Sequence, residues 1–166
     1  ADEIPKREGE TPLKSCSESE AVDDSHETYG KRKAEGDRAV FAAADEGIRA
    51  MSVRPTIVYG PHDYTERLDY WLARVDSHGA VVVPGDGGSL HQLAYVEDVA
   101  SALRVVAERG TAGEAYNVGD RDAQPLGDLL DLLAAACETD VRQAYASERE
   151  LSPDLEPDDF PLYRDR

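Results

Sequence analysis

A tyrosine and a lysine four residues apart offer the clearest chemistry in this sequence. Tyr29 and Lys33 lie in the stretch TYGKRKA. Positions i and i+4 share one face of a helix, so their phenol and ammonium can point into the same cleft. An ammonium close to a phenol favours the phenolate, and such a pair can move a proton to or from a substrate hydroxyl or carbonyl. The same spacing also occurs by chance on many helices, so the pair needs support from its surroundings.

No second catalytic centre is evident from the other reactive residue types. The histidines show no ligand spacing with carboxylates or cysteines, so we expect no metal site. Cys16 and Cys137 lie far apart in the sequence, which fits a reducing compartment. The opening stretch ADEIPKREGE is charged and polar, unlike a signal peptide. We therefore expect a cytoplasmic protein.

The chain is strongly acidic. It has 35 acidic and 18 basic residues among 166, for a formal net charge of −17, and the acids are spread along the whole sequence. Such a surface repels phosphate backbones and anionic lipids, so we expect neither nucleic acid nor membrane partners. No apolar run approaches the ~20 residues of a membrane helix. Dispersed carboxylates are typical of halophilic proteins, in which salt screens their repulsion; an ordinary acidic cytosolic protein is the alternative.

The element that must position Tyr29 and Lys33 is a helix. Ser25 or Thr28 can cap its start, and Gly47 is a good C-terminal stop. Spacing by three or four residues predicts an inward face that consists of Tyr29, Lys33, Gly36, Val40 and Ala44. The pair should therefore continue the apolar side of this helix rather than lie on its solvent side.

The rest of the sequence alternates between strand and helix patterns. Strands are expected at 51–59, 80–84, 91–96 and 114–119, and helices at 64–79, 96–110 and 125–138. The second of these helices has Asp98 near its start, and the first has an apolar stripe that consists of Leu68, Trp71, Leu72 and Val75. Alternation of this kind predicts an α/β fold with a partly parallel sheet.

Four motifs in order resemble a known family. TYGKRKA is followed by VRPTIVYGP, then GDGGSLHQLAYVEDVASAL, then GEAYNVGD. Together they resemble the extended short-chain dehydrogenase/reductase family, the NAD-dependent epimerase/dehydratases, over about residues 25–135. The resemblance implies the C-terminal part of a Rossmann-like doubly wound parallel sheet plus a small substrate-binding α/β region. It suggests an acidic surface loop at 1–25, the acid/base helix and core strand at 26–62, mostly substrate-side elements at 63–140 and an irregular tail at 141–166.

The resemblance also implies roles for particular residues. Tyr29 matches the catalytic acid/base, and Lys33 matches the residue that supports its phenolate and holds the nicotinamide ribose hydroxyls. Pro55, Thr56 and Ile57 match the segment that lies along the nicotinamide of NAD or NADP. Asp98 matches the family's aspartate after a strand, which we interpret as a structural helix cap.

The substrate side is less defined. Tyr64 and Arg67 follow the Tyr-Gly-Pro loop, near the substrate cleft in the family, whereas Trp71 and Leu72 fit a core role equally well. His91 stands where nucleotide-sugar enzymes often carry an arginine that pairs with phosphate, and histidine cannot make the same bidentate contact. This makes a nucleotide-linked sugar less favoured as substrate. The alternative for His91 is a partly buried strand residue without a ligand role.

One family motif is missing from the sequence. No Gly-x-x-Gly-x-x-Gly turn, which would bind the cofactor pyrophosphate, occurs in it. The resemblance therefore implies that about 110 residues precede this segment in a full-length member. We expect the segment alone to bind NAD(P) weakly or not at all and to be inactive, whereas the parent would be an NAD(P)-dependent enzyme for a small molecule. A homodimer is compatible with this. The alternative function is a non-catalytic scaffold or cofactor-sensing protein from the same superfamily.

Overall fold

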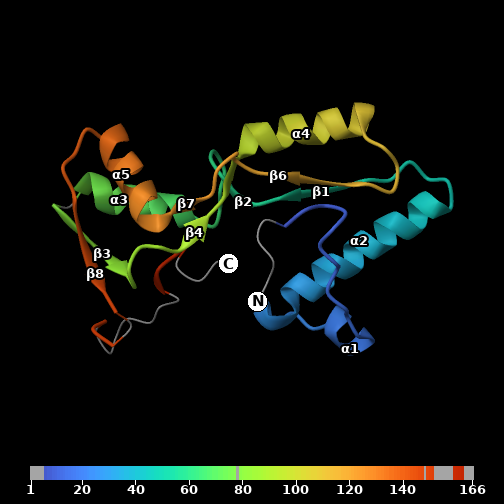
Figure 1. Cartoon of the computed structure of the whole chain (residues 1–166), viewed down its shortest axis with the longest axis horizontal. Coiled ribbons are helices and arrows are strands. Elements are labelled where there is room, and N and C mark those ends of the chain that lie inside the picture. Colours follow the sequence, from blue (N-terminus) through green and yellow to red (C-terminus); the bar gives the residue numbers. More distant parts are fainter. Residues whose placement is uncertain (1–5, 78, 148, 152–158, 163–166) are drawn as a thin grey trace. The chain divides into compact units, whose positions relative to one another are not determined.

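The computed structural model describes residues 6–77, 79–147, 149–151 and 159–162 (Figure 1). The chain divides into two compact units. The first comprises Ala1–Thr56 and Glu97–Val118, and the second comprises Ile57–Val96 and Gly119–Arg166. The units do not coincide with the consecutive ranges expected from the sequence, because the segment 97–118 returns to the first unit.

The first unit is a parallel strand pair with a helix on each side. Strand β1 (Ser52–Pro55) pairs in parallel with β6 (Ala115–Val118), in register from Ser52 opposite Ala115 to Pro55 opposite Val118. Figure 1 shows α4 (Val96–Arg109) on one side of this pair and α2 (Tyr29–Asp45) on the other. A short helix α1 (Glu18–Ala21) and the 3-10 turn η1 (His26–Thr28) precede α2. Asp98 lies in the first turn of α4, as expected.

Helix α2 has the expected bounds, but its N-terminal part does not have the expected inward face. It begins after Thr28 and ends before Gly47, whose φ of +89° suits glycine. The predicted inward stripe was wrong at its N-terminal end, because Tyr29, Lys33 and Gly36 are exposed. Among the described residues of α2, the buried position is Ala34. Polar bonds from Asp37 to β1, rather than an apolar stripe, fix which side of α2 faces the strands.

The described residues of the second unit form three strand pairs and two helices. Strand β2 (Ile57–Tyr59) pairs in parallel with β5 (Leu93–Tyr95), and β3 (Ala80–Pro84) pairs in parallel with β8 (Arg142–Ala146). The short strands β4 (Leu90–His91) and β7 (Gln124–Pro125) are antiparallel. The helices are α3 (Arg67–Ser77) and α5 (Leu126–Ala136). The parallel pairs and the alternation of helices with strands confirm the α/β class.

Trp71 is at the centre of the hydrophobic core of the second unit. It is fully buried, its indole Nε1 donates a hydrogen bond to the Pro161 carbonyl at 2.8 Å, and its ring stacks on that of Phe160. Apolar side chains from α3, β3, α5 and the segment 159–162 surround it: Val75, Val81, Val83, Leu126, Leu129, Leu130, Ala134 and Leu162. The predicted stripe on α3 is confirmed for Leu68, Trp71 and Val75, whereas Leu72 is 36% exposed.

Three expectations about elements need correction. The segment expected as a loop at 1–25 contains α1, whose start is fixed by a capping box between Ser17 and Glu20. The segment expected as an irregular tail contains β8, whose mixed sequence RQAYA becomes a strand because it pairs with the apolar β3. The strand expected at 51–59 is two strands separated at Thr56. None of the helices in the described part of the chain is long and apolar enough to span a bilayer.

Candidate functional site

Tyr29 and Lys33 lie together at the N-terminal end of α2. The Lys33 Nζ is 5.6 Å from the centroid of the Tyr29 ring. Tyr29 is 51% exposed and Lys33 is also exposed, so both functional groups can reach a ligand. The exposure that contradicts the predicted inward face is compatible with proton exchange, which needs an accessible phenol. Lys31 does not join the pair, because its ammonium is hydrogen-bonded to Glu20.

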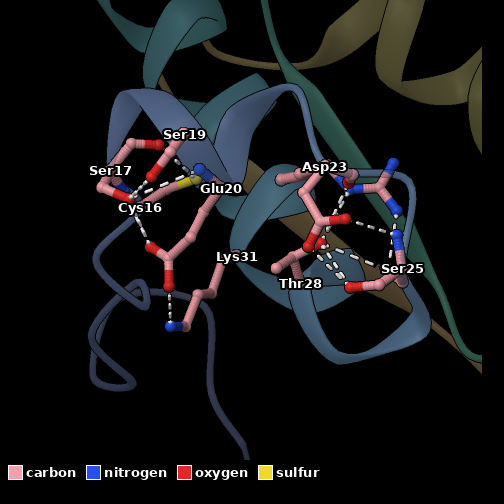
Figure 2. A network of polar contacts seen from close by, with 9 residues as sticks. Cys16, Ser17, Ser19, Glu20, Asp23, Ser25, Thr28 and Lys31 are labelled. Atoms are coloured by element: carbon pink, nitrogen blue, oxygen red, sulfur yellow. Dashed lines mark hydrogen bonds and ion pairs between the residues drawn. The ribbon is translucent and has the colours of Figure 1, made fainter.

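A polar network holds the chain just before Tyr29 (Figure 2). Glu20 accepts hydrogen bonds from the Ser17 backbone N–H and from the Lys31 Nζ. The Lys31 bond is the main reason why the pKa of Glu20 is lowered to about 2, and it also raises the pKa of Lys31. The pair connects α1 to the first turn of α2, two residues before Lys33.

A second group of contacts in the same network fixes the entry into α2. The Ser25 Oγ donates to Asp23 Oδ2 at 2.7 Å, and the Thr28 Oγ1 donates to the Asp23 carbonyl at 3.0 Å. The hydrogen bonds from Ser25 lower the pKa of Asp23. Arg32 Nε in turn donates to Thr28 Oγ1 at 3.3 Å. Thr28 is thus buried, and its hydroxyl is bonded to a residue that precedes it in the chain. These contacts fix the backbone at the position from which Tyr29 begins α2.

The segment expected along a nicotinamide begins at the end of β1. The Thr56 backbone N–H donates to the Val118 carbonyl at 2.9 Å, which continues the β1–β6 pairing by one residue. The Thr56 Oγ1 is buried and has no hydrogen-bond partner in the part of the chain that the structure describes. An orphaned hydroxyl of this kind suits a ligand amide. Pro55 and Thr56 belong to the same unit as Tyr29 and Lys33, whereas Ile57 begins β2 in the other unit.

These residues fit the nicotinamide half of a dinucleotide. An accessible phenol, a neighbouring ammonium and an unsatisfied hydroxyl supply the donors that a ribose and a carboxamide need. The described residues contain no group of three or more His, Cys, Asp or Glu side chains that could hold a metal ion.

The expected substrate residues lie in the second unit and differ in exposure. Tyr64 is 94% exposed, and Arg67 is half-buried at the start of α3. On either side of Tyr64, the Asp63 carboxylate accepts hydrogen bonds from both the N–H and the hydroxyl of Thr65, which shapes the loop.

His91, the third expected substrate residue, is only 3% exposed. It lines a cavity of about 10 Å³, together with Leu93, Asp120, Asp122, Gln124 and Leu129. Such a cavity has room for about one water molecule, not for a sugar. The burial supports the alternative interpretation of His91 as a strand residue.

Sequence reasoning missed a polar cluster between α2 and β1. Asp37 accepts hydrogen bonds from Ser52 and Arg54. The available hint was the position of Asp37, four residues after Lys33 and thus near the same helical face. Its partners could not be identified, because they depend on how the helix packs on the strand.

Comparisons with known proteins concern the family and the fold of the chain. A family model described as "NAD dependent epimerase/dehydratase family" matches residues 2–119. The chain is 31% identical over 103 residues to a trifunctional UDP-glucose 4,6-dehydratase, UDP-4-keto-6-deoxy-D-glucose 3,5-epimerase and UDP-4-keto-L-rhamnose reductase of Arabidopsis thaliana. That match covers 61% of this chain and 15% of the relative.

Solved structures support the same fold. RMD from Pseudomonas aeruginosa, solved with NADPH, matches with a TM-score of 0.63 at 21% identity, covering 82% of this chain and 51% of that one. A dTDP-glucose 4,6-dehydratase from Bacillus anthracis, solved with NAD, matches with a TM-score of 0.61 at 19% identity, covering 93% and 52%. The chain therefore spans about half the length of these structures and a smaller part of the Arabidopsis relative.

Proposed function

Because the chain belongs to the NAD dependent epimerase/dehydratase family, we propose that the full-length protein uses NAD or NADP to transform a hydroxyl or carbonyl of a small, sugar-derived molecule. The reaction is an epimerisation, a dehydration or a reduction. The names of the Arabidopsis and Bacillus proteins, both of which act on nucleotide-linked glucose, support a sugar-derived substrate.

In the proposed mechanism, Tyr29 exchanges a proton with the substrate oxygen. As a phenolate, Tyr29 accepts the proton of a substrate hydroxyl as that hydroxyl becomes a carbonyl, and as a phenol it returns the proton in the reverse direction. Lys33 stabilises the phenolate through its positive charge and donates hydrogen bonds to the ribose. Pro55, Thr56 and Ile57 orient the nicotinamide, which supplies the hydride acceptor or donor when it is bound.

The observation that carries the proposal is the placement of the Lys33 ammonium 5.6 Å from the Tyr29 ring, with both groups accessible on one side of α2. In the same unit, Thr56 carries a buried hydroxyl without a described partner. Two lysines two residues apart on this helix therefore differ in role, since Lys31 is bound to Glu20 and Lys33 lies by Tyr29.

This difference provides a matched experiment. Lys33→Met and Lys31→Met each remove one ammonium from α2 in the full-length protein. Turnover is measured with dTDP-glucose and UDP-glucose as probes, and NAD⁺ and NADP⁺ affinities are measured by titration. We expect Lys33→Met to lower kcat by about 100-fold, within the usual range for acid/base groups, and Lys31→Met to stay close to wild type. Binding of NAD⁺ without turnover of either probe would favour the scaffold alternative over an enzyme of sugar nucleotides.

A further inference from the structure

A partly buried ion pair connects the helix of the acid/base pair to the strand of the cofactor segment. The Arg54 Nε donates to Asp37 Oδ2 at 2.7 Å, and the Ser52 Oγ donates to Asp37 Oδ1. The side chains of Asp37 and Arg54 are only 16% and 25% exposed. The Arg54 guanidinium also lies over the Phe41 ring, 6.0 Å from its centroid. Both carboxylate oxygens of Asp37 thus accept hydrogen bonds from side chains of one strand, β1.

The two ends of this bridge stand next to the functional residues. Asp37 is one helical turn after Lys33 and two turns after Tyr29. Arg54 directly precedes Pro55 and lies two residues before Thr56. A displacement of α2 along β1 would therefore move the phenol and ammonium relative to the nicotinamide segment, and the bridge opposes that displacement.

A second acid near Arg54 is already engaged. The Glu8 carboxylate accepts a hydrogen bond from the Asn117 N–H on β6 at 2.9 Å. It contributes a favourable charge to Arg54 but makes its hydrogen bond elsewhere. Asp37 is accordingly the acid that determines where the Arg54 side chain lies.

We propose that Asp37 and Arg54 are positioning residues that hold Tyr29 and Lys33 in register with the Pro55–Thr56 segment. This inference rests on the proposed function of Tyr29 as acid/base. A misplacement of about 1 Å can lower a rate by roughly 100-fold. If the salt bridge had a structural role alone, its removal would lower the stability of the fold and leave kcat per folded molecule unchanged.

The test compares two carboxylates of the same helix in the full-length protein. Asp37→Asn removes the charge that binds Arg54, and Asp37→Glu keeps it. Glu35→Gln is the matched control, since Glu35 pairs with Arg38 at 2.8 Å on the exposed side of α2. For each variant we measure kcat and KM with dTDP-glucose, NAD⁺ affinity, the melting temperature, and amide hydrogen exchange of residues 29–37.

We expect Asp37→Asn to lower kcat by roughly 10- to 100-fold, with KM and NAD⁺ affinity close to wild type and faster exchange in residues 29–37. Asp37→Glu should recover part of kcat, and Glu35→Gln should change none of these quantities. An unchanged kcat together with a lower melting temperature would overturn the proposal. If Asp37→Asn does not fold, Arg54→Gln replaces it, and a wild-type kcat in that variant has the same meaning.

A double variant separates this inference from the proposed function. In the Tyr29→Phe background, Asp37→Asn should cause no further loss of kcat, because Asp37 acts through Tyr29. A further loss of the same size would show an independent role and overturn the proposal. If Tyr29→Phe alone leaves kcat unchanged, the proposed function fails first and the positioning role fails with it.

Discussion

Phe160 makes the packing of the second unit directly testable, because its ring covers the single tryptophan of the chain. The Phe160 and Trp71 ring centroids are 6.4 Å apart with an interplanar angle of 25°, and Phe160 is 6% exposed. Phe160→Ala removes this ring and leaves a cavity beside the indole. Substitutions of this kind cost ~3–5 kcal/mol in cores. We expect the lower end, about 3 kcal/mol, because the Trp71–Pro161 hydrogen bond still holds the segment.

The assay is urea unfolding followed by tryptophan fluorescence, which reports on Trp71 alone. With a denaturant slope of about 2 kcal/mol per molar, the midpoint should fall by about 1.5 M. The native emission maximum should also move to longer wavelength as water approaches the indole. Phe41→Ala is the matched control, since Phe41 is the other phenylalanine of the chain and lies against Arg54 in the first unit. If Phe160→Ala keeps both the wild-type midpoint and emission, the segment 159–162 does not pack on Trp71.

Three further predictions concern the loop after β2, the surface pair beside α2 and the net charge. Gly60→Ala should lower the free energy of unfolding by at least ~2 kcal/mol, because Gly60 has a φ of +119° and a Cβ would lie 2.7 Å from the Tyr95 ring; an unchanged urea midpoint would refute this. Because the pKa of Glu20 is lowered, its bond to Lys31 stabilises the folded state at pH values above the ordinary pKa of 4.5, and this stabilisation is lost as the pH falls toward about 2. The melting temperature of Glu20→Gln should therefore lie below wild type near neutral pH and converge with it in acid, whereas a constant difference would contradict the assignment. The melting temperature of the wild type should rise between about 0.1 and 2 M KCl, since salt screens the repulsion of a −17 chain; a fall would argue against a halophilic surface.

The fold was predictable where local sequence and tertiary packing agree. Helix α2 has a turn at its start and a glycine at its end, and β3 is a run of valines. Strand β8 was missed because RQAYA has no period of its own and becomes a strand only beside β3. The inward stripe of α2 was wrong at Tyr29, Lys33 and Gly36, which are exposed, and the charged Asp37 contacts β1 instead. An apolar periodicity cannot anticipate a polar contact of this kind.

The residue types of the candidate site were predictable from the sequence, but the contacts that hold those residues in place were not. Tyr29 and Lys33 follow from the motif order, and the structure places their side chains near each other. Arg54 was part of a quoted motif, yet its pairing with Asp37 depends on how α2 lies on β1. The burial of His91 likewise depends on residues from β7 and α5 that are far from it in sequence.

The most direct test of the central claim, that Tyr29 is the acid/base of this site, is the kcat of Tyr29→Phe in the full-length protein. The control is Tyr145→Phe, which removes a hydroxyl from a similarly exposed tyrosine whose oxygen donates a hydrogen bond to Gln143 at 2.8 Å. With dTDP-glucose or UDP-glucose as probe, we predict that Tyr29→Phe lowers kcat by about 100-fold or more, that NAD⁺ affinity is retained and that Tyr145→Phe matches wild type. A Tyr29→Phe enzyme that turns over as fast as the Tyr145→Phe control would contradict the account.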